Sequence, residues 1–189
     1  ASSRPSAMHV RNAAEQRAWL DQVREAPIDP DRPIIDPHHH LWTHAEGRQP
    51  YLLADLWADT GSGHRITQTV FIECRASYRG EGPEHLKPVG ETEFVARIAR
   101  ASREGGGGAA IAGFVGHADL RLPRAQLNAV LDAHVLASGG LFRGIRHSIS
   151  CDPDPQALSI PGRAPAGLAR DPAFRAGVAQ LGERGLAYD

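Results

Sequence analysis

The segment that most constrains this chain is residues 33–42, which read Pro-Ile-Ile-Asp-Pro-His-His-His-Leu-Trp. An apolar run leads directly into an Asp-x-His-x-His pattern. Side chains two residues apart in a strand lie on the same face, so His38 and His40 are expected to project together. Neutral imidazole is a preferred ligand of zinc and similar ions. The segment therefore predicts two ligands of a metal site at the end of a strand.

A plainer interpretation also fits these residues, namely that they are packed or solvated loop histidines. His39 is expected to point the opposite way from its neighbours and to serve packing or support. Two imidazoles do not complete a catalytic zinc site, which usually takes three protein ligands and leaves one position open. The remaining ligands must come from elsewhere.

Composition restricts the classes of partner. The 189 residues are 41% hydrophobic and carry a net charge of −1 with ten histidines counted as neutral. The sequence has no Lys/Arg cluster, so neither nucleic acid nor an anionic membrane is an expected partner. No apolar run approaches the ~20 residues of a membrane span, and residues 1–10 lack the apolar core of a signal peptide. We expect a cytoplasmic protein with reduced Cys74 and Cys151, a disulfide between them being the alternative.

Hydrophobic periodicity predicts an alternation of helices and strands. Helices are expected over residues 12–25, 89–103, 124–137 and 172–184, with a further short helix between residues 43 and 66. Strands are expected over residues 34–36, 67–74, 109–115 and 141–149, and residues 186–189 open a fifth. The third long helix should bury Leu127, Val130, Leu131 and Val135. The glycine run 105–108 lacks the Lys-Ser/Thr of a phosphate loop and is interpreted as a flexible connector.

This order of elements indicates an α/β fold with a parallel sheet and helices outside it. The polar residues follow the carboxyl ends of the strands, where α/β barrels and open parallel sheets place their chemistry.

Six segments, residues 35–42, 69–73, 88–94, 113–120, 142–147 and 185–189, carry a family resemblance. Through them the chain resembles the amidohydrolase superfamily, in particular the amidohydrolase 2 group of metal-dependent TIM-barrel hydrolases. That group includes proteins similar to 2-pyrone-4,6-dicarboxylate lactonase and the sugar-lactone hydrolases. The resemblance extends from about residue 30 to the end of the chain.

The resemblance implies a (β/α)₈ barrel in which His38 and His40 are the first two metal ligands. It also implies a further histidine from a later strand and a general-base aspartate from the last one, both beyond residue 189. A full barrel needs about 250 residues. We therefore expect an amino-terminal half-barrel over residues 33–189, ending near the start of strand five, after an extension over residues 1–32 with a short helix.

Candidates for holding the substrate are Glu73 after the second strand and Arg143, Arg146 and His147 on the fourth. Strand alternation places Arg143 and His147 on one face and Arg146 on the other, unless a bulge intervenes. A structural ion pair is the alternative role for a strand arginine or for Glu73.

His117 and Asp119 follow the third strand, where Asp119 could simply cap the next helix. Asp36 is expected to face the same way as His38 and to orient a ligand histidine.

The resulting hypothesis is a metal-dependent hydrolase that opens a lactone, an ester or amide being the other substrate classes. Zinc is the first expectation for the divalent metal and manganese the second, although some lactonases of the group work without a metal. The substrate would be a small lactone or carboxylate. A decarboxylase of the same superfamily and a non-catalytic fragment are the alternatives. The 189-residue chain alone is expected to turn over little or no lactone, and its unpaired sheet edges invite association, with a homo-oligomer as one outcome.

Overall fold

The computed structural model describes residues 13–23, 25–43, 49–154 and 164–189. Five strands form one sheet in the order β1-β2-β3-β4-β5, and every neighbouring pair is parallel. The strands are β1 (Ile34–His39), β2 (Ile66–Ile72), β3 (Ala110–His117), β4 (Phe142–Arg146) and β5 (Ala187–Tyr188). Sequential parallel pairing without a reversal of order is the arrangement of a (β/α) barrel rather than of a doubly wound sheet.

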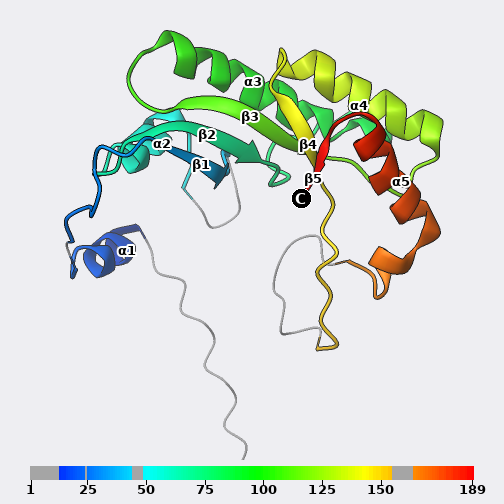
Figure 1. Cartoon of the computed structure of the whole chain (residues 1–189), viewed down its shortest axis with the longest axis horizontal. Coiled ribbons are helices and arrows are strands. Elements are labelled where there is room, and N and C mark those ends of the chain that lie inside the picture. Colours follow the sequence, from blue (N-terminus) through cyan, green and yellow to red (C-terminus); the bar gives the residue numbers. More distant parts are fainter. Residues whose placement is uncertain (1–12, 24, 44–48, 155–163) are drawn as a thin grey trace, which may run out of the picture.

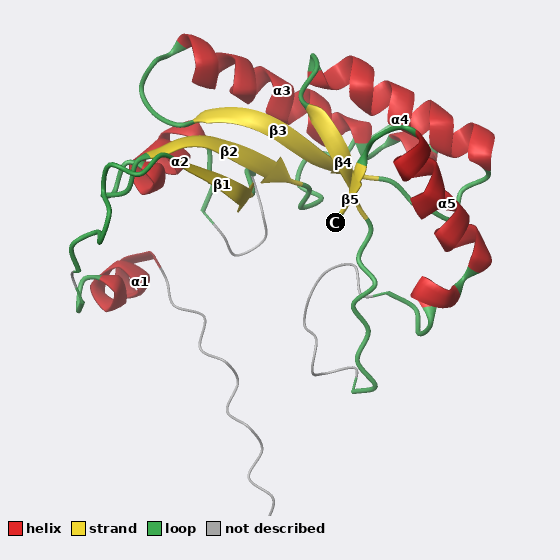
Figure 2. Ribbon diagram, viewed as in Figure 1, coloured by secondary structure: helices red, strands yellow, loops and turns green. Residues whose placement is uncertain are grey.

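The three long helices lie on the convex side of a curled sheet (Figure 1). The three long ones are α3 (Val89–Glu104), α4 (Arg124–Ser138) and α5 (Pro172–Glu183). The shorter elements are α1 (Ala13–Leu20), α2 (Leu53–Thr60), η1 (Glu84–Leu86) and η2 (Leu168–Arg170). Figure 2 shows the strands as an arc with α3, α4 and α5 outside it, so the sheet has the shape of a partial barrel. None of the helices in the described ranges has the length and apolar character needed to cross a membrane.

Two apolar clusters join the helices to the outer face of the sheet. One contains Phe71 and Phe114 from β2 and β3 with Val95 from α3, and the other contains Ile145 from β4 with Leu131 from α4. Each fully buried side chain of this size contributes about 1.5–3 kcal/mol relative to exposure. These contacts hold the helices against the outer face of the sheet.

Local signals explain where the last helix begins and ends. The Asp171 carboxylate accepts a hydrogen bond from the Ala173 backbone N–H at 2.8 Å, and Pro172 occupies the first turn. Both are favoured at helix starts. Gly185 has a φ of 66°, and the Leu186 N–H donates to the Leu181 carbonyl at 2.9 Å. This left-handed glycine ends the helix and directs the chain into β5.

Three expectations from the sequence are corrected by the structure. The first helix is shorter than residues 12–25, since its described part ends at Leu20. Val135 is 48% exposed, and its neighbour His134 is instead fully buried together with Leu127, Val130 and Leu131. The apolar periodicity did not predict the burial of His134, because histidine is polar. The ring can be buried here because both of its nitrogens are hydrogen-bonded inside the protein.

The third correction concerns the glycine run before β3, which packs closely instead of acting as a free connector. A Cβ added to Gly105, Gly107 or Gly108 would lie within 2.9 Å of a ring atom of Trp57 on α2. The Trp57 indole N–H also donates to the Ala109 carbonyl at 3.1 Å. The absence of side chains in this run makes room for the indole.

Candidate functional site

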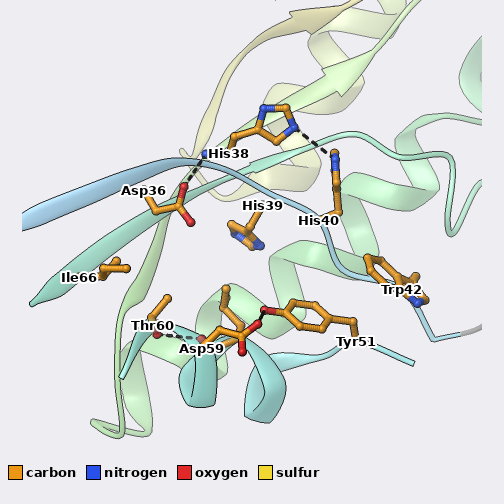
Figure 3. Close-up of a pocket in the computed structure, with 10 residues that line it drawn as sticks. Asp36, His38, His39, His40, Trp42, Tyr51, Asp59, Thr60 and Ile66 are labelled. Atoms are coloured by element: carbon orange, nitrogen blue, oxygen red, sulfur yellow. Dashed lines mark hydrogen bonds between the residues drawn. The ribbon is translucent and has the colours of Figure 1, made fainter. Parts of the chain in front are cut away.

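The side chains of His38 and His40 meet at the carboxyl-terminal end of β1. Their Nε2 atoms are 3.2 Å apart, and the rings are nearly perpendicular. The two imidazoles project to the same side, as a spacing of two residues in a strand predicts. Figure 3 shows the rings converging, with His39 turned away from them.

Hydrogen bonding fixes which nitrogens carry lone pairs. His40 Nδ1 lies 2.8 Å from the Ile72 carbonyl oxygen, which can only accept, so Nδ1 is the protonated nitrogen. In neutral His40 the lone pair is therefore on Nε2. Burial and neighbouring cationic groups lower the pKa of His40 although the Ile72 carbonyl opposes them, and this favours the neutral ring. His40 thus presents a lone pair to His38.

Arg146 reaches the same point from β4. Its Nη2 is 3.3 Å from His38 Nε2, and because a guanidinium can only donate, His38 Nε2 is the acceptor in this contact. Arg146 also forms an ion pair with Asp189, which directly follows β5. Residues 108 positions apart therefore meet inside the curl of the sheet, and Asp189 offsets the positive charge of Arg146.

Two imidazole lone pairs facing each other at 3.2 Å repel unless a proton or a cation lies between them. Two nitrogens bound to one tetrahedral zinc at 2.0–2.1 Å would be about 3.3 Å apart. The pair therefore fits two positions of a divalent metal site. Within the described ranges, no group of three or more His, Cys, Asp or Glu side chains is arranged to hold a metal. His38 and His40 thus offer two positions of such a site rather than a full set.

Arg143 lies away from this point. Its guanidinium donates to the backbone carbonyls of Gly140 and Phe142, at the start of β4. The pairing of β3 with β4 shifts between Phe142 and Gly144, so a bulge at Arg143 breaks strict alternation. The structure brings Arg146, but not Arg143, to the histidine pair.

Glu73 ends β2 and is buried, with Tyr78 Oη 3.4 Å from its carboxylate. The adjoining loop is fastened by Glu91 of α3, which is only 2% exposed and accepts from the N–H groups of Cys74 and Ala76. Between those two residues Arg75 has a φ of 64°, an uncommon conformation for a side chain of this size. Burial raises the pKa of Glu91 to about 7. Glu91 holds the strained turn that follows Glu73.

His147 packs on the outer side of the rim. Its Nδ1 accepts from the Leu120 N–H at 3.1 Å, and its ring contacts Phe174. Burial lowers the pKa of His147 to about 4, so the ring is neutral at pH 7. Asp119 pairs with Arg121 and accepts from the Arg121 backbone N–H. Asp119 therefore stabilises the turn after β3.

A cavity of about 330 Å³ lies beside β1, lined by residues of β1 and α2 (Figure 3). His39 points into this region and is only 7% exposed, and among the described residues neither of its ring nitrogens has a hydrogen-bond partner. Burial lowers its pKa to about 4. A register shift between Asp36 and His39 leaves the Asp36 side chain beside His39 rather than beneath His38. Asp36 instead accepts from the His38 backbone N–H at 3.0 Å.

Several residues of the site were not assigned from the sequence. Tyr78, Glu91 and Asp189 owe their places to loop geometry and to strand order, which no local pattern reveals. Glu91 and Asp189 do lie in segments that carry the resemblance.

Cys74 and Cys151 are both free thiols.

Comparisons with known proteins support the fold. No family model matches the chain. A relative in Sinorhizobium fredii, the uncharacterized protein y4mH, is 30% identical over 171 residues, covering 84% of this chain and 53% of the relative. The crystal structure of an amidohydrolase from Burkholderia multivorans with bound HEPES has a TM-score of 0.52 and 24% identity, over 82% of this chain and 47% of that one. The chain thus spans about half the length of the proteins it matches and shares the fold of part of an amidohydrolase.

Proposed function

We propose that this chain is the amino-terminal half of an amidohydrolase-type barrel that hydrolyses a small lactone. The observation that carries the proposal is the meeting of the His38 and His40 Nε2 atoms, 3.2 Å apart, at the carboxyl-terminal rim of a curled parallel sheet. The structural likeness to an amidohydrolase supports the hydrolase class. The lactone class comes from the resemblance of the sequence motifs.

His38 and His40 would hold the divalent ion, with zinc as the first expectation and manganese as the second. A bound ion of this kind lowers the pKa of its water towards neutrality and polarises a carbonyl. The hydrogen bond from His40 Nδ1 to the Ile72 carbonyl fixes the orientation of that ring.

Arg146 is the group best placed to bind an anionic part of the substrate. Its guanidinium lies at the histidine pair and is held there by Asp189. Charge-assisted hydrogen bonds from arginine to a carboxylate or an oxyanion are among the stronger polar contacts in proteins. Glu73 and His147 would shape the neighbouring rim. We assign no substrate contact to Arg143, because its guanidinium bonds to carbonyls at the opposite end of β4.

Metal binding tests the site directly. We would titrate the metal-free chain with zinc by calorimetry and compare wild type with His38→Ala, His40→Ala and His64→Ala. His64 is exposed and serves as the matched control. We expect each site variant to bind zinc at least about tenfold more weakly, and His64→Ala to match wild type within about twofold. Equal affinity in all four proteins would reject the histidine pair as a metal site.

Turnover tests the reaction class. A panel of five- and six-membered lactones would be assayed with zinc or manganese added. We expect a low, metal-dependent rate of ring opening, which His38→Ala abolishes and His64→Ala retains. Metal binding without any lactone opening would reject the lactonase and leave the metal site standing. Carbon dioxide release from aromatic acids would identify a decarboxylase instead.

A further inference from the structure

The cavity between β1 and α2 has a wall made of a fixed aromatic pair. Trp42 and Tyr51 are joined by two backbone hydrogen bonds of 3.0 and 2.9 Å, and their rings stack 5.4 Å apart at 25°. The Trp42 indole N–H donates to the Gln49 carbonyl at 2.7 Å. Leu56 of α2 adds an apolar side chain, and the volume of about 330 Å³ lies within the range of small-molecule sites. A wall held in this way can receive a ligand at little cost in ordering.

Two carboxylates give the cavity a negative charge. Among the described residues, its lining contains Asp36 and Asp59 but no Lys or Arg. One oxygen of Asp36 accepts from the His38 N–H at 3.0 Å, and one of Asp59 accepts from the Tyr51 hydroxyl at 2.6 Å. Within the described ranges neither carboxylate has an ion-pair partner. Each therefore keeps an oxygen that can accept from a cation.

The Tyr51 hydroxyl does not balance this charge. Burial, the hydrogen bond to Asp59 and the charges of Asp59, Asp55 and Asp36 raise the pKa of Tyr51. The phenol is therefore neutral and only donates one hydrogen bond to the acidic side of the cavity. The remaining acceptors favour a ligand that is positively charged and carries several N–H groups.

His39 is an independent indication of a ligand. It is 7% exposed, its ring points into the cavity (Figure 3), and no described residue bonds to either ring nitrogen. Buried polar groups in proteins are almost always hydrogen-bonded, and an unpaired one is destabilising. A neutral imidazole accepts through one nitrogen. A ligand N–H donated to that nitrogen would supply the partner that His39 lacks.

We propose that this cavity binds a free small organic cation, an alkylammonium or alkylguanidinium ion whose N–H groups donate to Asp36, Asp59 and His39. The alkyl part of the ligand lies against the wall formed by Trp42 and Tyr51, whose ring faces also attract a cation. The two carboxylates repel an anion of the same size.

This site differs from the histidine pair in direction. His38 and His40 border the cavity, but their Nε2 atoms face each other 3.2 Å apart, and His39 is turned away from them (Figure 3). Binding of the organic cation needs no metal and no hydrolysis of a lactone. The inference therefore stands or falls independently of the proposed function.

The first test measures binding to the metal-free chain by calorimetry at neutral pH. The ligands form a matched series of butylammonium, butylguanidinium, butyrate and butanol. We expect only the two cations to bind. Butyltrimethylammonium has the charge but no N–H group, and it should bind at least about tenfold more weakly than butylammonium. Failure of both cations to bind, or equal binding of butyrate, butanol or butyltrimethylammonium, would overturn the inference.

The second test uses substitutions that keep the side-chain shape and remove one charge. We expect Asp36→Asn and Asp59→Asn each to raise the Kd of butylammonium about tenfold or more. Asp31→Asn, at an exposed position outside the cavity, should match wild type within about twofold. Zinc affinity provides a second readout, because Asp59→Asn should bind zinc as wild type does. Unchanged amine binding in both site variants, or loss of zinc together with the amine in Asp59→Asn, would contradict a separate cation site.

The third test uses wild type and does not depend on the folding of a variant. In long-range ¹H–¹⁵N spectra of histidine-labelled protein, butylammonium should shift the ring nitrogens of His39 and leave those of the exposed His64 unchanged. The spectrum of His39→Phe identifies the His39 signals. Saturation with butylammonium without a change at His39 would remove His39 from the site.

The same spectra distinguish a free cation from one carried on a polypeptide. We expect N-acetylarginine amide to bind no more tightly than butylguanidinium, because the cavity holds a small molecule. Binding of the arginine derivative at least about tenfold tighter would show that the site recognises a side chain of another polypeptide, and the assignment to a free cation would be wrong.

Discussion

Histidines on the inner rim of the sheet and histidines beneath the helices are used in opposite ways. On the rim, His40 and His117 each bond through Nδ1 to a backbone carbonyl, and no backbone group of the described residues bonds to their Nε2 atoms. Under α4, His134 uses both nitrogens, with Thr92 Oγ1 2.8 Å from Nδ1 and the His117 carbonyl 3.0 Å from Nε2. The difference shows that available partners, rather than residue type, decide whether an imidazole can do chemistry or serves as a structural link.

The largest effect expected from this comparison is on the buried link. His134→Leu removes the ring that stacks on Phe142 and leaves the Thr92 hydroxyl and the His117 carbonyl without this partner. A buried polar group left unpaired costs about 1–3 kcal/mol. We expect the free energy of unfolding in urea to fall by about 3 kcal/mol. The exposed neighbour provides the control, since Val135→Ala should change it by less than about 0.5 kcal/mol. A loss below about 1 kcal/mol would mean that both groups find other partners.

The comparison of wild type with His134→Leu can also be made as a function of pH, and the expected change in stability is nearly as large. Burial lowers the pKa of His134 from 6.5 to about 4. Folding therefore favours the neutral ring, and this contribution is present above pH 6.5 and is lost as the pH falls towards 4. A shift of this size corresponds to at most roughly 3 kcal/mol.

We therefore expect the stability difference between wild type and His134→Leu to shrink as the pH is lowered from 7 to 4 in urea titrations. The raised pKa of Glu91 acts in the opposite direction, with stability lost as the pH rises towards 7. Glu91 is present in both proteins, so its contribution cancels in the difference. A difference that stays constant with pH would show that His134 titrates normally.

The order of the elements could be predicted from the sequence because each long helix and strand carries its own period. The residues at which β2 and β4 end, Ile72 and Arg146, could not be predicted in this way, because the end of a strand depends on its neighbouring strands. Spacing within one strand was likewise sufficient to bring His38 and His40 together. The meeting of His38 with Arg146 required the curvature of the whole sheet, and the position of Arg143 required a bulge. Both are tertiary effects, and the alternation of side chains along a single strand cannot predict them.

A smaller effect is expected at His39, which sits between the two regions. It is buried like His134, but the described part of the chain supplies no partner for either ring nitrogen, and its ring contacts Phe71 edge-on at 5.8 Å. Replacement of an unpaired polar group by an apolar group of similar shape is neutral or stabilising. His39→Phe should raise the free energy of unfolding by about 1 kcal/mol, whereas His64→Phe at an exposed position should not. A decrease in the His39 variant would show that its ring nitrogens bind an ordered water or another partner.

The smallest effect on stability is expected on the rim itself. His38 is exposed, and within the described ranges its side-chain hydrogen bonds are those of Nε2 with His40 and Arg146, both of which water can satisfy. His38→Ala should therefore change the free energy of unfolding by less than about 0.5 kcal/mol in metal-free buffer. Added zinc should distinguish the stability of wild type from that of His38→Ala, because a ligand that binds only the folded state stabilises it according to its concentration and affinity. The melting temperature of wild type should rise with added zinc, and that of His38→Ala should rise much less. A large loss of stability in metal-free His38→Ala would mean that the rim histidines are structural, and the contrast with His134 would then not hold.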